Sequence, residues 1–167
     1  VAEVAQQFPE VTHRVELFDA LLGKVIMKPE NFQIVLVLNE YGDFLSDMAC
    51  GLAGSLGIGA SSNLGFDAGA VVRVAMFDAA HGTAPDIAGK NLANPTAIFL
   101  ALSMLLYQLG EITAGQAIKN STLDLLREGI RTRDLGGQES TDSFADAVAR
   151  EVMQRLASKK PVPQVFT

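Results

Sequence analysis

Residues 76–95 constrain the fold of this chain more than any other stretch, because they can form neither a continuous helix nor a continuous strand. Proline removes a backbone donor and fixes φ, and glycine interrupts regular elements. The stretch contains Gly82, Pro85, Gly89 and Pro95, which predicts a long loop stiffened at fixed points. Loops of this length in compact domains are usually functional.

The polar side chains of this loop suit a nucleotide ligand. His81 offers a ring nitrogen, and the following Gly82 would let the backbone approach a ligand closely. Thr83 and Asn94 supply hydrogen-bonding groups, and Asp86 supplies one carboxylate. The sequence therefore predicts a nucleotide-binding loop.

A second candidate site follows residues 32–38, an almost unbroken apolar run with the composition of a buried strand. Asp43 and Asp47 come soon after it, four residues apart, and a helix would place both on one face. Such a pair is often only part of a solvated face. Its position after a strand, where α/β sheets bind ligands, favours a site for Mg²⁺ or Mn²⁺, which prefer oxygen ligands.

Both candidate sites resemble segments of one known family. Residues 81–90, HGTAPDIAGK, together with 93–96, ANPT, resemble the adenosine-binding loop of the isocitrate and isopropylmalate dehydrogenases, which are metal-dependent β-decarboxylating enzymes. Residues 39–47, NEYGDFLSD, resemble the metal-binding segment of the same family. The two motifs stand in the family's order and at its spacing. The alternative is an unrelated α/β domain with a loop rich in glycine and proline.

The resemblance implies an α/β fold of the isopropylmalate dehydrogenase type, in which a parallel or mixed sheet is flanked by helices. Because family members are much longer, we expect the chain to be the C-terminal half of a longer enzyme, with some strands whose partners lie in the other half. Residues 1–53 would belong to the smaller, subunit-contacting, metal-binding domain, and residues 54–167 to the larger cofactor-binding domain. The small residues of 51–65 would form a hinge between them.

The resemblance also implies a divalent metal that two subunits share. Asp43 and Asp47 would bind Mg²⁺ or Mn²⁺ together with Asp19 of the neighbouring subunit, because residues 17–20, LFDA, match the family segment that completes its neighbour's site. The enzyme would then be at least a homodimer. The family's catalytic Lys and Tyr would lie upstream of this chain, so we expect the chain alone to be inactive.

The resemblance implies NAD as the cofactor. Asp86 would accept hydrogen bonds from the adenosine ribose hydroxyls and would repel the 2′-phosphate of NADP. Asp78 stands where the family usually has the longer Glu. The implied cofactor-binding residues are Asp78, His81, Gly82, Thr83, Ala84, Asp86 and Asn94.

The implied reaction is oxidation of a small 2-hydroxy polycarboxylate, followed by loss of CO₂. Thr83 and the segment DLGG at 134–137 favour NAD-dependent isocitrate dehydrogenase. The 3-isopropylmalate, homoisocitrate and tartrate dehydrogenases remain open, as does a non-catalytic subunit or fragment of the family.

Composition excludes other functions. The net charge of −6 argues against a protein that binds duplex nucleic acid, which needs a basic surface. The longest apolar stretch, residues 98–109, is too short to span a bilayer. The single cysteine, Cys50, is typical of a reducing compartment, so we expect the cytoplasm, or the mitochondrial matrix in a eukaryote.

The spacing of apolar residues predicts the remaining elements. Strands are expected at 11–18, with Asp19 at the end, at 32–38 and at 71–77. Helices are expected at 1–8, at 20–27, after Gly42 with Asp43 in the first turn, from Pro95 to Gly110, at 114–128, and after a cap at Ser140 or Thr141. The helix after Pro95 should bury Ile98, Leu102, Leu105, Leu106 and Leu109.

Overall fold

The computed structural model describes residues 1–158, so the end of the predicted cofactor domain, residues 159–167, lies outside the described part. The chain separates into two compact units, Val1–Ser46 and Asp47–Thr167, which divide within helix α3 (Asn39–Leu52). The predicted boundary between residues 53 and 54 falls just after this helix. The assignment of subunit contacts to one domain and of cofactor binding to the other stays a prediction.

The first unit contains short helices and a single buried apolar side chain, that of Leu21. Its elements are α1 (Ala2–Ala5), α2 (Phe18–Met27), the 3-10 turn η1 (Pro29–Asn31) and the start of α3. The helix predicted over residues 1–8 is confirmed only for its first part, because no side chain caps α1 and so short a helix has little stability of its own. The helix predicted at 20–27 is confirmed as α2.

The strands predicted at 11–18 and 32–38 are absent from the described structure, where neither segment is assigned as strand. A strand exists only where a second strand supplies its hydrogen bonds, and an apolar run cannot provide that by itself. Phe18 begins α2 instead, so Asp19 lies in the first turn of a helix and not at the end of a strand. In the second segment, Ile34 is 91% exposed, so the predicted burial of this apolar run is also wrong for the described residues.

Helix α3 begins at Asn39, so the prediction of a helix that starts only after Gly42 is wrong, and Asp43 lies in the second helical turn and not in the first. The reason is that Gly42 N donates to Leu38 O at 2.9 Å, which continues the helical hydrogen-bond pattern through the glycine. Asp43 and Asp47 remain on one helix, four residues apart, as predicted.

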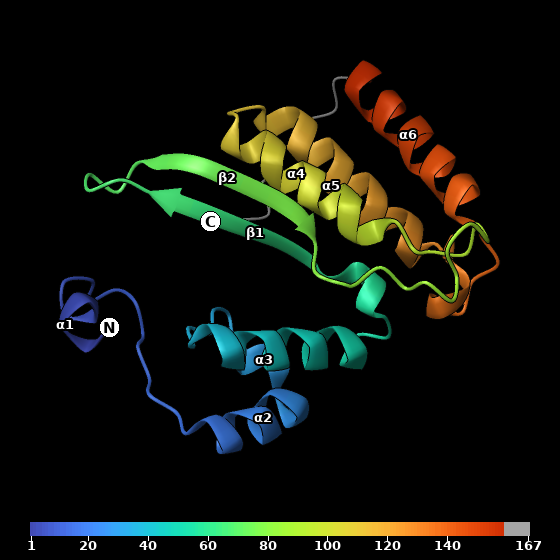
Figure 1. Ribbon diagram of the computed structural model, residues 1–167. Coiled ribbons are helices and arrows are strands. Elements are labelled where there is room, and N and C mark those ends of the chain that lie inside the picture. The colour runs from blue at the N-terminus through green and yellow to red at the C-terminus, as the bar shows by residue number, and fades with distance from the viewer. Residues whose placement is uncertain (159–167) are drawn as a thin grey trace. The chain divides into compact units, whose positions relative to one another are not determined.

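The second unit contains an antiparallel hairpin of β1 (Ala60–Phe66) and β2 (Val72–Ala79), which lies beside the helical layer in Figure 1. The predicted strand at 71–77 is confirmed as β2. The hinge predicted over 51–65 is wrong for residues 60–65, which pair with β2 in the register Ser61 opposite Asp78. The turn is closed by Asp67, whose Oδ1 accepts hydrogen bonds from Gly69 N and Val71 N.

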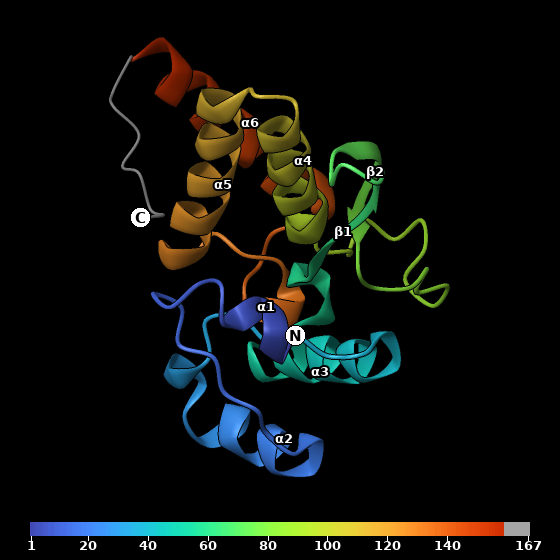
Figure 2. The ribbon, with the colours of Figure 1, turned by 90° about the vertical axis from the view of Figure 1, so that its left-hand side faces the viewer.

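Three long helices follow this hairpin, and Figure 2 shows them from another side. The first packs against the hairpin, the second against the first, and the third against the second. They are α4 (Thr96–Gln108), α5 (Ile112–Arg127) and α6 (Thr141–Ala157), and the short turns η2 (Leu56–Ile58) and η3 (Arg133–Leu135) precede β1 and α6. All three helices confirm the prediction. Helix α6 is capped by Ser140, whose Oγ accepts from Ser143 N at 3.1 Å while Ser143 Oγ accepts from Ser140 N at 2.9 Å.

Helices α4 and α5 meet through small residues, which the hydrophobic pattern did not reveal. Ala97, Ala101 and Ala117 are buried, whereas Ile98 is 52% exposed, so the predicted buried face of α4 is wrong. Ser103 Oγ donates to Gly115 O at 2.8 Å, and a Cβ at Gly115 would lie 2.8 Å from the ring of Tyr107. The two backbones are therefore too close for larger side chains between them.

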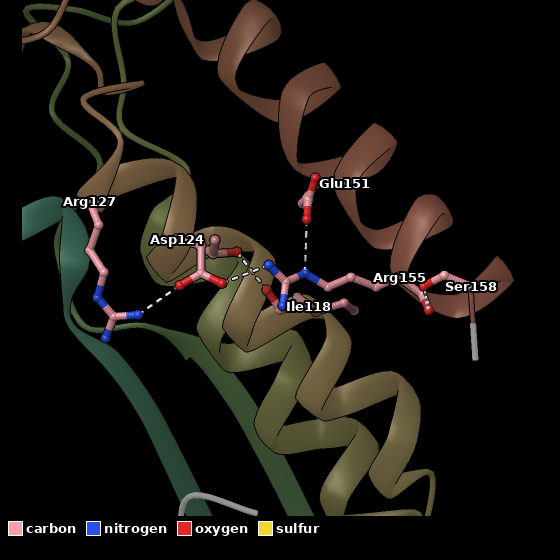
Figure 3. A network of polar contacts seen from close by, with 7 residues as sticks. Ile118, Asp124, Arg127, Glu151, Arg155 and Ser158 are labelled. Carbon is pink, nitrogen blue, oxygen red and sulfur yellow. Dashed lines mark hydrogen bonds and ion pairs between the residues drawn. The ribbon is translucent and has the colours of Figure 1, made fainter. Parts of the chain in front are cut away.

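Helices α5 and α6 share an apolar core and a polar network. Leu125, Phe144 and Val148 form the core cluster. Asp124 accepts from Arg155 at 2.6 Å and from Arg127 at 2.7 Å, as Figure 3 shows. Partial burial raises the pKa of Asp124, but the two arginines outweigh this effect and hold the pKa below its usual value. Within residues 1–158, no helix is long and apolar enough to cross a membrane.

Candidate functional site

The predicted nucleotide-binding loop is confirmed as a loop, which runs from the end of β2 at Ala79 to the start of α4 at Thr96. Its first part is a series of local turns, in which Ile87 N donates to Ala84 O and Lys90 N donates to Ile87 O, each at 3.1 Å. Ala84 has a φ of 41°, in the left-handed region that costs a non-glycine residue about 1 kcal/mol or more. Strain of this kind is concentrated at functional sites.

The residues at the start of the loop have room for a ligand. His81 is exposed, and its Nδ1 lies 2.8 Å from Gly82 O, so Nδ1 donates to this carbonyl and Nε2 is left for contact with a ligand. A Cβ built at Gly82 would meet no atom within 4 Å. Packing among the described residues therefore leaves the space beside Gly82 open.

Asp78, at the end of β2, carries an unsatisfied acceptor. Its Oδ1 is buried and has no hydrogen-bond partner in the described structure. A buried carboxylate oxygen without a donor is costly, and a ligand hydroxyl or amide would remove that cost. The open space at Gly82 and this unpaired oxygen both fit the binding of a ribose or amide group, so the residues present fit a dinucleotide such as NAD.

The second part of the loop is fastened to the start of α6, which it passes in Figure 1. Asn91 Nδ2 donates to Asp142 Oδ2 at 3.1 Å, and Asp142 N donates back to Asn91 Oδ1 at 3.0 Å. Thr141 N donates to Asn91 O at 3.1 Å, and Thr141 Oγ1 donates to Ala93 O at 2.6 Å. Two segments some fifty positions apart in the sequence are thus held as one piece.

Asn94, a predicted cofactor ligand, is buried and its side chain is already engaged. Its Oδ1 accepts from Thr96 N at 3.0 Å, and its Nδ2 donates to Asp134 Oδ2 at 2.9 Å. Partial burial raises the pKa of Asp134, but hydrogen bonds from Ser55, Thr132 and Asn94 outweigh it and hold the pKa below its usual value. Direct contact between Asn94 and a cofactor stays a prediction.

Sequence reasoning missed Asp134, Thr141 and Asp142, which hold the loop in place. No local pattern marks them, because their partners lie forty or more positions away. Asp134 belongs to the segment DLGG, whose sequence alone indicates a substrate preference and not a contact with the loop.

The predicted metal ligands are present but not gathered into a complete site. Asp43 and Asp47 are exposed on α3, and Asp19 is exposed at the start of α2. Within residues 1–158, no three His, Cys, Asp or Glu side chains come together as a metal site. Two hard carboxylates one helical turn apart suit part of the coordination of Mg²⁺ or Mn²⁺, which takes its remaining ligands from water and other oxygens.

Cys50 lies one turn after Asp47 on α3 and is half-buried. Burial, with a smaller contribution from the Asp47 carboxylate, raises the pKa of its thiol. A Cβ at Gly59 would lie 2.7 Å from Cys50 Sγ, so the thiol is packed against the chain that leads into β1. These surroundings disfavour the reactive thiolate.

Comparison with known proteins places this chain in one family of enzymes. The family described as isocitrate/isopropylmalate dehydrogenase matches residues 1–148. The chain belongs to this family. The resemblance that the two sequence motifs carried is therefore confirmed.

Relatives within the isocitrate/isopropylmalate dehydrogenase family differ in substrate. An isocitrate/homoisocitrate dehydrogenase of Thermus thermophilus is 43% identical over 148 residues, which are 89% of this chain and 42% of the relative. A 3-isopropylmalate dehydrogenase of Salinibacter ruber is 39% identical over 96% of this chain and 42% of its own length. The chain thus spans less than half the length of these relatives.

A solved structure of the family confirms the predicted fold. The isocitrate dehydrogenase from Methylococcus capsulatus superimposes with a TM-score of 0.82 at 36% identity, covering 90% of this chain and 44% of that one. The fold is therefore the mixed α/β architecture of this family, of which the described residues form a part.

Proposed function

We propose that this chain is part of a longer NAD-dependent enzyme that oxidises isocitrate and decarboxylates it to 2-oxoglutarate with the help of Mg²⁺ or Mn²⁺. The observation that carries the proposal is the region where β2 leads into the loop before α4: Asp78, near the end of β2, has an unpaired oxygen, and the loop has an open space at Gly82 and a strained Ala84. Membership of the dehydrogenase family supports the reaction type.

Charge supports NAD as the cofactor. Asp86 is exposed in the loop, where its carboxylate would accept hydrogen bonds from the two ribose hydroxyls of NAD. The same carboxylate would repel the 2′-phosphate of NADP. His81 and Thr83 would add hydrogen bonds, and Asp78 would gain the donor that it lacks in the described residues.

The metal-binding part rests on Asp43, Asp47 and the Asp19 of a second copy of the chain. A bound divalent cation would polarise the hydroxyl and carbonyl oxygens of the substrate. In this proposal the three carboxylates hold the cation and orient the 2-hydroxy acid, and none of them acts as the general base. Proton transfer falls to residues outside this chain, so the chain alone would be inactive and the active enzyme would be at least a homodimer.

The test is an assay of the full-length enzyme that contains this chain. NAD⁺ reduction should occur with isocitrate, should need Mg²⁺ or Mn²⁺, and should be much slower with 3-isopropylmalate, homoisocitrate or tartrate. Faster reduction with one of these other acids would move the proposal to that substrate. A preference for NADP⁺ would show that Asp86 has been misinterpreted.

Two alternatives have support among the relatives. The 3-isopropylmalate dehydrogenase of Salinibacter ruber keeps 3-isopropylmalate open as the substrate. A relative from Dictyostelium discoideum, 37% identical over 155 residues, is named a regulatory subunit of NAD isocitrate dehydrogenase. The presence of Asp19, Asp43 and Asp47 favours a catalytic chain over a regulatory one, because a regulatory subunit has no need of metal ligands.

A further inference from the structure

Three segments of the second unit converge on the carboxylate of Asp134. Thr132 Oγ1 donates to Asp134 Oδ1 at 2.6 Å, and Asn94 Nδ2 donates to Asp134 Oδ2 at 2.9 Å. The Ser55 hydroxyl, from the segment that follows α3, is also hydrogen-bonded to this carboxylate. One side chain thus connects the segment before η2, the end of the loop and the turn before α6.

We propose that Asp134 is a positioning residue for the cofactor loop, which it holds through the buried side-chain amide of Asn94. This inference rests on the proposed binding of NAD to that loop. Asn94 is only 8% exposed, and its other amide atom, Oδ1, accepts from Thr96 N in the first turn of α4. The Asn94 amide is therefore fixed from both ends, by Asp134 on one side and by α4 on the other.

Asn94 is closely packed on the side that faces the η2 turn. A Cβ at Gly57 would lie 2.9 Å from Asn94 Cβ, so the η2 turn presses directly against this residue. If the hydrogen bond to Asp134 were lost, the Asn94 Nδ2 group would be a buried donor without an acceptor, which is costly. The end of the loop would have to shift to reach water, and the ligand groups before it would shift too.

The arrangement requires a carboxylate at position 134. Both Thr132 and Asn94 present donors, so both oxygens of Asp134 must act as acceptors. An amide at this position would offer one oxygen and one NH₂ group, and the NH₂ group would face a donor. Asp134→Asn is therefore a small change in shape that breaks the network at one defined atom.

The experiment compares D134N with D146N in the full-length enzyme. Asp146 lies exposed on α6, and its side chain has no hydrogen bond or ion pair to the residues that the structure describes, so D146N removes the same charge without touching the loop. We expect D134N to raise the Kd for NAD⁺, measured by calorimetry without substrate, about tenfold, which corresponds to about 1.4 kcal/mol. At saturating NAD⁺, kcat should match that of D146N. Equal Kd values for the two variants, or a lower kcat with an unchanged Kd, would overturn the inference.

An exchange of the two side chains covers the case in which D134N does not fold. N94D alone sets two carboxylates against each other, whereas N94D combined with D134N restores a donor facing an acceptor. We expect the double variant to bind NAD⁺ more tightly than N94D does. A double variant that binds no better than N94D would contradict the role given to Asp134.

A measurement of NAD⁺ binding to the unsubstituted enzyme distinguishes a failure of this inference from a failure of the proposed function. If it does not bind NAD⁺, the proposed function fails, and the role of Asp134 is then judged by hydrogen exchange of the backbone amides of residues 91–94 and 96. We expect these amides to exchange faster in D134N than in D146N. Equal exchange rates would overturn the role of Asp134 whatever the cofactor is.

Discussion

The two predicted sites differ in how much of each this chain holds in place by itself. The end of the predicted nucleotide-binding loop is held to α6 and to Asp134 by side-chain hydrogen bonds. It adjoins a helical layer that has its own apolar core. Asp43 and Asp47 are exposed on α3, and their carboxylates form no hydrogen bond or ion pair with the described residues. A loop of irregular backbone needs internal support, whereas a pair of carboxylates on a helix needs only the helix and an ion.

The sharpest test of this comparison is to remove Asp47, one of the proposed metal ligands. D47N in the full-length enzyme should lower kcat/KM by about a thousandfold or more, because the bound metal would supply several kcal/mol of charge stabilisation to the transition state. Mn²⁺ binding, followed by electron paramagnetic resonance, should weaken in parallel. E40Q, a change in the first turn of the same helix, is the matched control. Unchanged Mn²⁺ affinity in D47N would remove Asp47 from the site.

The apolar core between α5 and α6 can be tested by removing the aromatic side chain of Phe144. Phe144 is completely buried between α5 and α6, so F144A should lower the free energy of unfolding by about 3–5 kcal/mol. Met153, on the same helix, is 65% exposed, and M153A should have little effect. Chemical denaturation measures both. Equal losses would mean that α6 is not held by this core.

The first part of the loop, which contains Asp86, can be tested through the choice between NAD⁺ and NADP⁺. D86S should raise the ratio of NADP⁺ to NAD⁺ efficiency by about tenfold or more, because a contact between like charges near a protein surface costs roughly 1–4 kcal/mol. D146S, with the same change in charge on α6, should leave the ratio as it is. An unchanged ratio in D86S would place the ribose away from Asp86.

The smallest expected effect concerns the network between α5 and α6. The pKa of Asp124 is lowered in the folded protein, so its contribution to stability is present above the unfolded value of about 4 and is lost as the pH falls further. D124N should therefore reduce stability at pH 7 by less than about 1 kcal/mol, because the carboxylate is partly exposed. The difference from the unsubstituted protein should shrink below about pH 4. A difference that persists at low pH would show that packing, and not charge, explains the loss.

The sequence predicted those parts of the fold that depend on local signals. The cap at Ser140 and the apolar spacing of α5 and α6 are local, and the structure agrees with them. The strand predicted at 32–38 is absent from the described residues, because a strand needs a partner and an apolar run alone does not supply one. The close contact of α4 with α5 depends on Ala97, Ala101 and Gly115, whose small size gives a weak hydrophobic signal.

The candidate site shows the same contrast between local signals and contacts that are distant in the sequence. Residues 81–86 could be predicted as one site because they are contiguous in the sequence, and the structure places them together in one loop. Asp134 and Asp142 were missed because their importance depends on partners that are distant in the sequence. Whether the predicted ligands touch NAD or a metal stays a prediction for the experiments above.

The attachment of Asn91 and Ala93 to Thr141 and Asp142 has a consequence for how the proposed cofactor site would open on heating. The first turn of α6 cannot fray without releasing the loop, so the two should open as one cooperative unit. Bound NAD⁺ would then protect the amides of α6 from exchange although it need not contact that helix, and a fluorescent reporter on α6 would register the arrival of the nucleotide.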